Sequence, residues 1–371
     1  IMPYISASII MQLMMPVIPS FEKMVREGES GRQKFNQITR YVTVIICCIQ
    51  GAIFATAMMR PEDLDMAGAS RVVINPGPAF VIMTIITLTA GAMFLMWLGE
   101  MVTERGIGNG ASLIITVNIV ARLPQALSAL WKLWIGGGTL TFIHILILFG
   151  MFFLICGATV AITQGHRKIP IRYARRMAGR GGMAAGTTSY LPLRVNYSGV
   201  MPIIFAGAIL SLPTMLLRVL PASVSGYVGP WFAYGNYRYM LLYAAMILLF
   251  SFFWVANQFN PRQIADDLQK RGGYVPGIRP GLPTAEFLDN TMTRITFAGA
   301  LFLTLLAVFP MMLYQKFSIP PMISQFFGGT SLLIMVGVML DTMRQVEAHL
   351  LSRHYDGFLK KGHLRSRRGS R

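Results

Sequence analysis

Side chains that could carry acid–base or ion-coupled chemistry are sparse in the apolar runs of this 371-residue sequence. Glu100 and Asp341 fall near one end of their runs, and Arg122 and the lone His144 fall near the other end of theirs. A proton- or ion-coupled transporter normally keeps carboxylates, histidines or paired charges inside its membrane spans, because charge there is costly and is retained for function. We therefore expect any path through this protein to be lined by apolar side chains.

Sequence motifs for catalysis, metal binding or a cofactor are also missing. The turn GIGNG (106–110) faintly resembles a phosphate-binding loop, but no strand precedes it and no G-x-x-x-x-G-K-[ST] motif occurs. We expect a tight turn there, with Asn109 at the N-cap of the next helix. His349 and His354 lack an H-E-x-x-H context, and the cysteines lie inside apolar runs. The sequence therefore predicts neither an enzyme nor a bound metal or cofactor.

Two basic stretches could bind anionic groups or a protein partner. The stretch 164–182 contains no acidic residue, and its cationic residues are Arg167, Lys168, Arg172, Arg175, Arg176 and Arg180. Such a run contacts anionic lipid or docks on a polyanion such as ribosomal RNA. The stretch 270–281, KRGGYVPGIRPG, places Lys270, Arg271 and Arg279 among glycines and prolines. These exclude a long helix or a ladder-paired strand, so we expect a rigid, bent loop that presents its arginines to a protein partner.

Membrane-spanning helices are the elements that must position these residues. The composition, 54% hydrophobic and 13% charged, is that of an integral membrane protein. The apolar runs are about 20 residues long, which matches the hydrocarbon thickness of a bilayer. The alternating pattern of a membrane β-barrel is absent, so backbone hydrogen bonding in lipid requires α-helices. We predict nine spans, at 1–19, 41–59, 79–98, 110–130, 139–163, 200–220, 238–258, 295–315 and 329–351.

Lys and Arg residues are distributed unevenly between the two sides of these spans. One side holds 26 of the 33, in the loops 20–40, 99–109, 164–199, 259–294 and the tail after 343. By the positive-inside rule that side, including the C-terminal tail, is cytoplasmic. Most of the formal charge of +18 therefore belongs to a cytoplasmic surface.

The sequence also resembles itself at two places. IMPYISASII (1–10) is similar to VMPIIFAGAI (200–209), and NGASLII (109–115) is similar to GGTSLLI (328–334). In the predicted topology the matching segments cross the membrane in opposite directions, which is the sign of an inverted-topology repeat with a path between its halves. Chance similarity of short apolar words is the alternative interpretation.

Isoleucines recur at helical spacing in these matched segments. The repeat aligns Ile5 with Ile204 and Ile115 with Ile334, and both Ile5 and Ile115 have another isoleucine four residues away on the same helix face. A ring of branched apolar side chains would exclude water and ions by dewetting and still admit a flexible polymer. Isoleucines that face lipid or neighbouring helices are the alternative.

Six stretches in order resemble the signature sequences of the SecY family, the channel subunits of the bacterial protein-conducting translocon. They are IMPYISASII, GESGRQKFNQITRY, ERGIGNGASLII, LPLRVNYSGVMPIIFA, FNPRQIADDLQKRGGYVPGIRPG and FGGTSLLIMVGVMLD, and the similarity runs from Ile1 to about Lys361. The resemblance implies an all-α polytopic membrane protein, an inverted-repeat helical bundle that opens toward lipid like a clamshell. About nine of the family's ten spans are expected in this sequence, without the first span, the plug segment and the outer half of the second span.

The resemblance also implies how the chain is divided. We expect an N-terminal half at 1–138, a C-terminal half at 139–351 with cytoplasmic loops 164–199 and 259–294, and a basic cytoplasmic tail at 352–371. The segments 1–19 and 200–220 become the main faces of a lateral gate, with 41–59 and 238–258 behind them.

Family site residues are carried over by motif. The pore ring falls on Ile1, Ile5, Ile115, Ile119, Ile204 and Ile334. The partner-docking residues are Arg279, which matches the arginine that matters for the motor, together with Lys270, Arg271, Arg172, Arg175, Arg176 and Arg180.

The implied function is a channel that passes unfolded secretory polypeptides across the membrane and releases transmembrane segments sideways into the bilayer. Implied partners are the SecE and SecG subunits, the SecA motor ATPase or the ribosome with its RNA, signal sequences and nascent polypeptides, and anionic lipids. The implied location is the bacterial plasma (inner) membrane, with the C-terminus in the cytoplasm. An inverted-repeat secondary transporter for small solutes is the alternative function; the lack of charges at mid-membrane and the basic loops argue against it.

Overall fold

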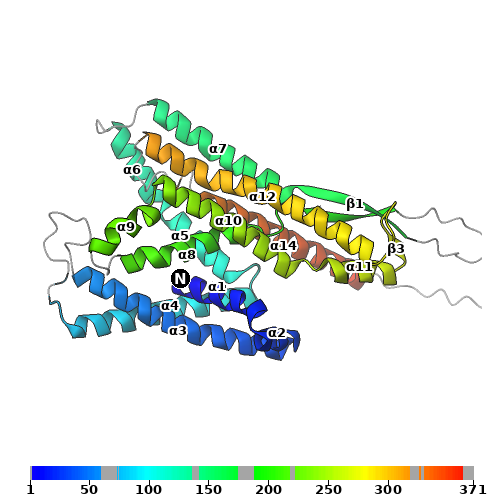
Figure 1. Cartoon of the computed structure of the whole chain (residues 1–371), viewed down its shortest axis with the longest axis horizontal. Helices are drawn as coiled ribbons and strands as arrows, with labels where there is room; N and C mark the ends of the chain where they lie inside the picture. Colours follow the sequence, from blue (N-terminus) through cyan, green and yellow to red (C-terminus); the bar gives the residue numbers. More distant parts are fainter. Residues whose placement is uncertain are drawn as a thin grey trace, which may run out of the picture.

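Helices make up most of the computed structural model, which describes residues 2–59, 73, 75–135, 142–173, 188–217, 222–317, 326 and 330–361. They run roughly along the long axis of the molecule, with the strands at one end (Figure 1). The elements are α1 (Met2–Val17), α2 (Pro19–Arg26), α3 (Glu29–Met59), α4 (Pro78–Arg105), α5 (Gly110–Ala121), α6 (Leu123–Ile135), α7 (Phe142–Gln164), β1 (His166–Tyr173), β2 (Thr188–Arg194), α8 (Met201–Leu217), α9 (Ala222–Phe232), α10 (Tyr237–Gln258), α11 (Pro261–Lys270), β3 (Gly273–Tyr274), α12 (Leu282–Phe317) and α14 (Thr330–Lys361).

A helix occupies each of the nine apolar segments predicted from the sequence. Among the described residues, six helices or joined helices are long and apolar enough to cross a membrane, and a seventh if α1 and α2, bent by 103°, form one span. α8 has 17 residues, and the apolar part of α14 ends at Asp341, so both are shorter than a full span. The positions of the helices are thus as predicted, while length and composition identify six or seven as spans.

Several helices continue well beyond their apolar segments. α12 has 36 residues and begins at Leu282, and α3 has 31 residues and begins at Glu29. At 1.5 Å per residue α12 is about 54 Å long, whereas the hydrocarbon core is about 30 Å thick. Hydropathy marks only the part of a helix that lies in lipid, which is why the predicted segments are shorter than the helices.

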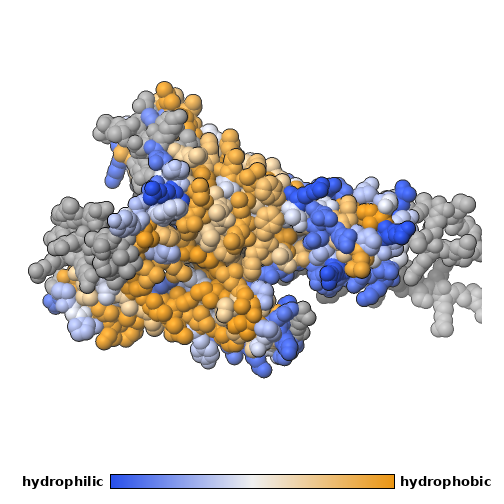
Figure 2. Space-filling model, viewed as in Figure 1, coloured by the Kyte–Doolittle hydropathy of each residue, from blue (hydrophilic) through white to orange (hydrophobic). Residues whose placement is uncertain are grey.

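An apolar belt covers the middle of the molecular surface. Figure 2 shows hydrophobic residues over the centre of the bundle and hydrophilic residues gathered at the end that carries the strands and α11. Large apolar side chains such as Met83, Phe153 and Leu146 are exposed. Exposed apolar surface of this extent fits a bundle surrounded by lipid.

A three-stranded sheet in the order β2-β1-β3 contains β1 from the first basic stretch, β3 from the second, and β2 from residues 188–194 between them. β1 pairs antiparallel with β2 from His166 opposite Arg194, and it pairs with β3 through Arg172 opposite Tyr274. The expectation that 270–281 contains no ladder-paired strand is therefore wrong for Gly273–Tyr274. A Cβ at Gly273 would lie 3.0 Å from the Tyr173 ring, so a larger residue there would require the ring to shift.

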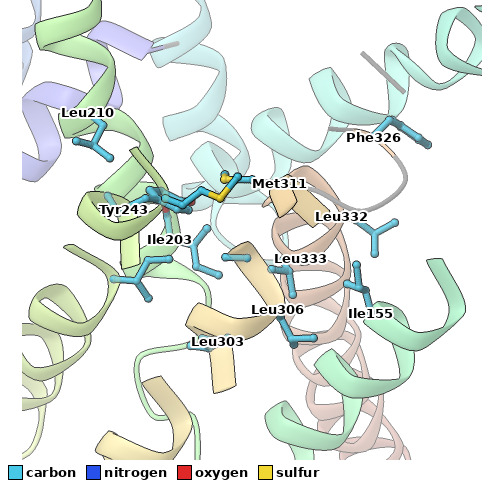
Figure 3. Close-up of a cluster of buried hydrophobic side chains, with 14 of the residues drawn as sticks. Ile155, Ile203, Leu210, Tyr243, Leu303, Leu306, Met311, Phe326, Leu332 and Leu333 are labelled. Carbon is cyan, nitrogen blue, oxygen red and sulfur yellow. The ribbon is translucent and has the colours of Figure 1, made fainter. Parts of the chain in front are cut away.

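The main hydrophobic core lies between α7, α8, α10, α12 and α14. Figure 3 shows side chains from these helices converging, among them Ile155, Ile203, Tyr243, Leu303 and Leu332. All five are almost fully buried. This core holds α8 against α7, α10, α12 and α14, and it also includes Ile9 of α1 and Ala126 and Leu130 of α6.

A second, smaller core ties the sheet to the helices. Ile169 of β1 and Leu193 of β2 pack with Leu288 of α12, Phe259 and Val275. The extension of α12 beyond its apolar segment therefore serves as the support for the sheet.

The linker 195–200 between β2 and α8 lies close against two helices. A Cβ at Gly299 of α12 would lie 2.6 Å from the carbonyl oxygen of Val195, and one at Gly337 of α14 would lie 2.4 Å from Val200 Cγ1. The Val195 N–H also donates to the Gly165 carbonyl at 2.9 Å. These approaches fix the point at which α8 begins.

We predict that Gly299→Ala destabilises the protein by about 1–3 kcal/mol, because the added methyl group overlaps the Val195 carbonyl. Gly150→Ala in α7 is the matched control, since no atom outside its own helix lies within 4 Å of a Cβ there. Thermal unfolding of both variants in detergent tests this. Equal midpoints for the two would show that α12 does not pack closely on the linker.

Candidate functional site

Five of the six predicted ring isoleucines line one cavity of about 700 Å³. Ile5 comes from α1, Ile115 and Ile119 from α5, Ile204 from α8 and Ile334 from α14. The sixth, Ile1, lies outside the described residues. Residues far apart in the sequence, chosen by spacing and by an internal repeat, are thus brought to one site.

The helices matched by the repeat also pack on one another. α1 contacts α8, and α5 contacts α14. Behind α8, α10 packs on it along the main core, and α3 contacts it as well. The arrangement places the segments 41–59 and 238–258 next to the α1–α8 contact, where the sequence analysis expected them.

The start of α5 is fixed by a side-chain cap. Asn109 Oδ1 accepts hydrogen bonds from the backbone N–H groups of Ala111, at 3.1 Å, and Ser112, at 3.4 Å. The predicted N-cap at Asn109 is confirmed. A cap of this kind sets where the helix begins, and hence where Ile115 and Ile119 lie along it.

The start of α8 is joined to α10. Tyr243 is fully buried, and its hydroxyl donates to the carbonyl oxygen of Ile203 at 3.4 Å. Ile204, the next residue, is only partly buried and lines the cavity. The hydrogen bond to Tyr243 fixes α8 at Ile203, and the next residue, Ile204, lines the cavity.

Polar residues also line the cavity, so the expectation of an apolar lining is wrong at these positions. They include Asn118, Arg122, Gln125 and Thr330. Arg122 is exposed, so its guanidinium can be hydrated at this side of the cavity. Asn118, a polar residue inside an apolar run, was a signal that could have been used.

A second cavity, of about 380 Å³, lies beside the same helix faces and is lined mainly by polar residues. Ser112 and Met201 line it, each three residues before the ring isoleucine of its helix, and Val338 lines it four residues after Ile334. Residues three or four apart share a helix face. The polar cavity therefore lies next to the isoleucine cavity along α5, α8 and α14.

The loop 270–281 exposes its arginine in a defined turn. Gly277 and Gly281, with φ of 84° and 97°, flank Arg279, whose side chain is exposed. Its carbonyl oxygen accepts a hydrogen bond from the Thr284 hydroxyl at 2.8 Å. The loop is bent and exposes Arg279, as the sequence analysis expected, and the structure adds its attachment to α12 through Thr284.

The sheet brings part of the other basic stretch to this loop. Arg172 is exposed on β1 opposite Tyr274, and Lys270 and Arg271 are exposed at the end of α11. The other predicted docking residues lie outside the described residues; they are Arg175, Arg176 and Arg180. In the described part of the chain, no group of three or more His, Cys, Asp or Glu side chains is placed to hold a metal ion.

Comparisons with known proteins agree on one family. A family model described as SecY matches residues 1–343. The protein translocase subunit SecY of Escherichia coli K12 is 42% identical over 373 residues, which cover 98% of this chain and 81% of the relative. That of Chlamydia muridarum is 39% identical over 380 residues and covers 99% and 83%.

Solved structures share the fold. One described as "The structure of a protein conducting channel" aligns with a TM-score of 0.60 at 19% identity, over 95% of this chain and 81% of the other. Another, described as Sec61 in the canine ribosome-channel complex, aligns with a TM-score of 0.59 at 18% identity, over the same shares of 95% and 81%.

We predict that a cysteine at Ile119 reacts with a membrane-impermeant, water-soluble maleimide and that a cysteine at Val117 does not. Ile119 lines the cavity, whereas Val117 is 66% exposed and lines an apolar groove between α5 and α14. Labelling in sealed and permeabilised membranes measures this. Equal labelling at both positions would contradict a water-accessible cavity on the Ile119 face.

Proposed function

This chain belongs to the SecY family, and from that premise we propose how its parts work. It is a multi-pass membrane protein and a protein-conducting channel. The family is one of translocon channels and not of enzymes. The inverted-repeat transporter for small solutes is therefore not favoured. The finer assignments below, to the ring, the gate, the loops and the partners, are our proposals.

The constriction of the channel is proposed to be the isoleucine ring: Ile1, Ile5, Ile115, Ile119, Ile204 and Ile334. The observation that carries this assignment is that five of them, from four helices, line one cavity. Branched apolar side chains offer no hydrogen bonds to water or ions, so a narrow opening between them dewets. An unfolded polypeptide can still pass because the contacts are non-directional and its backbone is flexible.

The α1–α8 contact is proposed as the lateral gate, with α3 and α10 behind it. α1 contacts α8 along a seam between the two halves, 1–138 and 139–351. An apolar segment that enters such a seam transfers from water to lipid, which is favourable by about 0.8 kcal/mol per buried methylene. Release into the bilayer then needs only separation of the helices and no chemical energy at the gate.

The basic loops are proposed to dock the partner that drives transport. Among the solved structures of this fold, one is described as Sec61 in the canine ribosome-channel complex and another as the yeast Ssh1 complex bound to the yeast 80S ribosome. For this chain we propose the ribosome or the SecA motor at Arg279, Lys270, Arg271 and Arg172, with Arg175, Arg176 and Arg180 of the same basic stretch.

The remaining assignments follow from family membership and charge. We propose SecE and SecG as fellow subunits and anionic lipids as contacts of the basic side. We also propose a bacterial plasma membrane location with the C-terminal tail in the cytoplasm, since that side holds 26 of the 33 Lys and Arg residues.

A photo-crosslinker at position 204 should react with a translocating chain that is halted midway, in membranes that contain the full-length protein. Leu301 of α12, which is 53% exposed on the outer face, is the control position and should react with lipid only. Mass spectrometry of the adducts measures both. Adducts of position 204 with lipid or neighbouring helices alone would contradict its place in the constriction and reopen the transporter alternative.

Arg279→Glu should reduce motor-driven transport about tenfold or more, because an exposed arginine at a docking site is replaced by the opposite charge. Arg32→Glu on α3 makes the same charge change at another exposed cytoplasmic position and should have little effect. Transport into inverted membrane vesicles, with the amount of assembled channel measured in parallel, tests this. Normal transport by the Arg279 variant would remove the loop from the docking site.

A further inference from the structure

An ion pair joins two helices that carry no ring residue. Arg40 of α3 donates from Nε to Glu100 Oε1 at 3.1 Å and from Nη2 to Glu100 Oε2 at 2.6 Å. This is the two-pronged geometry in which a guanidinium holds a carboxylate in a fixed orientation. The side chains are 45% and 22% exposed, so Glu100 is the more enclosed partner. The pair fixes α4 against α3 at the level of Glu100.

The residue before Glu100 is part of a close contact with α5. A Cβ at Gly110 would lie 1.8 Å from the carbonyl oxygen of Gly99. The Gly110 N–H donates to Thr103 Oγ1 at 2.9 Å, and the Thr103 hydroxyl donates to the Gly99 carbonyl at 2.9 Å. The first residue of α5, Gly110, therefore packs directly against the last turns of α4; we call this the Gly110 contact.

Two ring isoleucines lie further along α5 from the Gly110 contact. Ile115 and Ile119 are five and nine residues after Gly110. At 1.5 Å per residue they lie about 7.5 and 13.5 Å along the α5 axis. An uninterrupted helix of this length is stiff, so a shift of α4 moves both side chains together.

The other ring-bearing helix of the N-terminal half meets the same place. Tyr4 of α1 lines a polar cavity of about 190 Å³ together with Arg40, Glu100 and Asn109. α1 also contacts α4. Since Ile5 follows Tyr4 directly, both ring-bearing helices of this half border the cavity that contains the ion pair.

We propose that the Arg40–Glu100 pair positions the N-terminal half of the pore ring, setting Ile5 relative to Ile115 and Ile119. The pair acts through α4 and the Gly110 contact. It is a positioning element without a direct part in transport. This inference rests on the proposed role of the isoleucines as the constriction. A solvated surface pair without influence on the ring is the competing explanation.

The test measures the ring directly, in the full-length protein with its partner subunits in lipid vesicles. Spin labels at positions 5 and 119 report their separation by pulsed electron resonance, in a background where alanine replaces Cys47, Cys48 and Cys156. Ion leak through the idle channel is measured without labels.

The variants are Arg40→Ala, Glu100→Ala and the charge swap Arg40→Glu with Glu100→Arg. Arg105→Ala removes an exposed cation from the end of the same helix α4 and is the control. Each single variant should shift or broaden the 5–119 distance and raise the leak about two- to fivefold, the range that a partly exposed ion pair can carry. The swap should restore both, and the control should change neither.

Unchanged distances and leak in both single variants overturn the proposal. Failure of the swap to restore the distance also overturns it, because the effect then belongs to the separate side chains and not to the pair. A shifted distance with unchanged leak upholds the positioning role and overturns the role of the ring as a seal. The two hypotheses therefore fail in distinguishable ways.

Thr103 supplies a second test that keeps the ion pair and covers the case in which the charge variants do not fold. Thr103→Val removes the hydroxyl that accepts from Gly110, and Thr103→Ser retains it. The valine variant should shift the 5–119 distance and the serine variant should not. Identical distances in both variants would overturn the step from α4 to α5.

Discussion

Backbone hydrogen bonding in lipid is the constraint on which this structure depends. Water is absent from the hydrocarbon core, so each span must satisfy its own N–H and C=O groups within a helix. Several hydroxyl side chains in the spans also bond within their own helix: Thr43 donates to the Thr39 carbonyl, Thr159 to that of Ile155, and Thr304 to that of Ala300. A helix that satisfies its own polar groups holds its neighbours mainly by packing. Such helices can separate sideways without leaving backbone groups unpaired.

Polar contacts between helices are consequently informative where they do occur. Arg40 and Glu100 join α3 to α4, and Arg344 Nη2 donates to the Thr163 carbonyl at 3.0 Å, joining α14 to α7. Arg40 and Glu100 line the cavity of about 190 Å³ beside Tyr4, and Arg344 lines the polar cavity of about 380 Å³. These polar contacts fix α3 against α4 and α14 against α7. The α1–α8 contact is held mainly by apolar packing.

The sequence predicted the positions of the helices and five ring isoleucines that line one cavity. It did not predict the full length of α12, the pairing of β3 or the polar residues of the cavity. Apolar runs locate lipid-facing helices because transfer into lipid depends on composition, and four-residue spacing locates a helix face. The predicted segments were too short for α12 because charged residues such as Glu286 continue a helix into water. The pairing of β3 with β1 joins positions about a hundred residues apart through two residues, for which no local pattern exists. Asn118 and Gln125 reached the cavity through the tertiary arrangement of α5 and α6.

The same tertiary arrangement connects the basic loops to the gate. β3 pairs with β1, and β1 and β2 pack on α12 through Ile169, Leu193 and Leu288. β2 leads into the linker whose Val195 lies against Gly299 and whose Val200 lies against Gly337, and α8 begins at the next residue. A partner bound at the loop 270–281 therefore rests on a sheet whose strand β2 continues into α8 through six residues held on both sides. Close-packed contacts transmit displacement with little compression, so these contacts connect the proposed docking loop to the start of α8 and not directly to α1. In the function proposed above, a displacement of the sheet would therefore act on the α8 side of the α1–α8 contact.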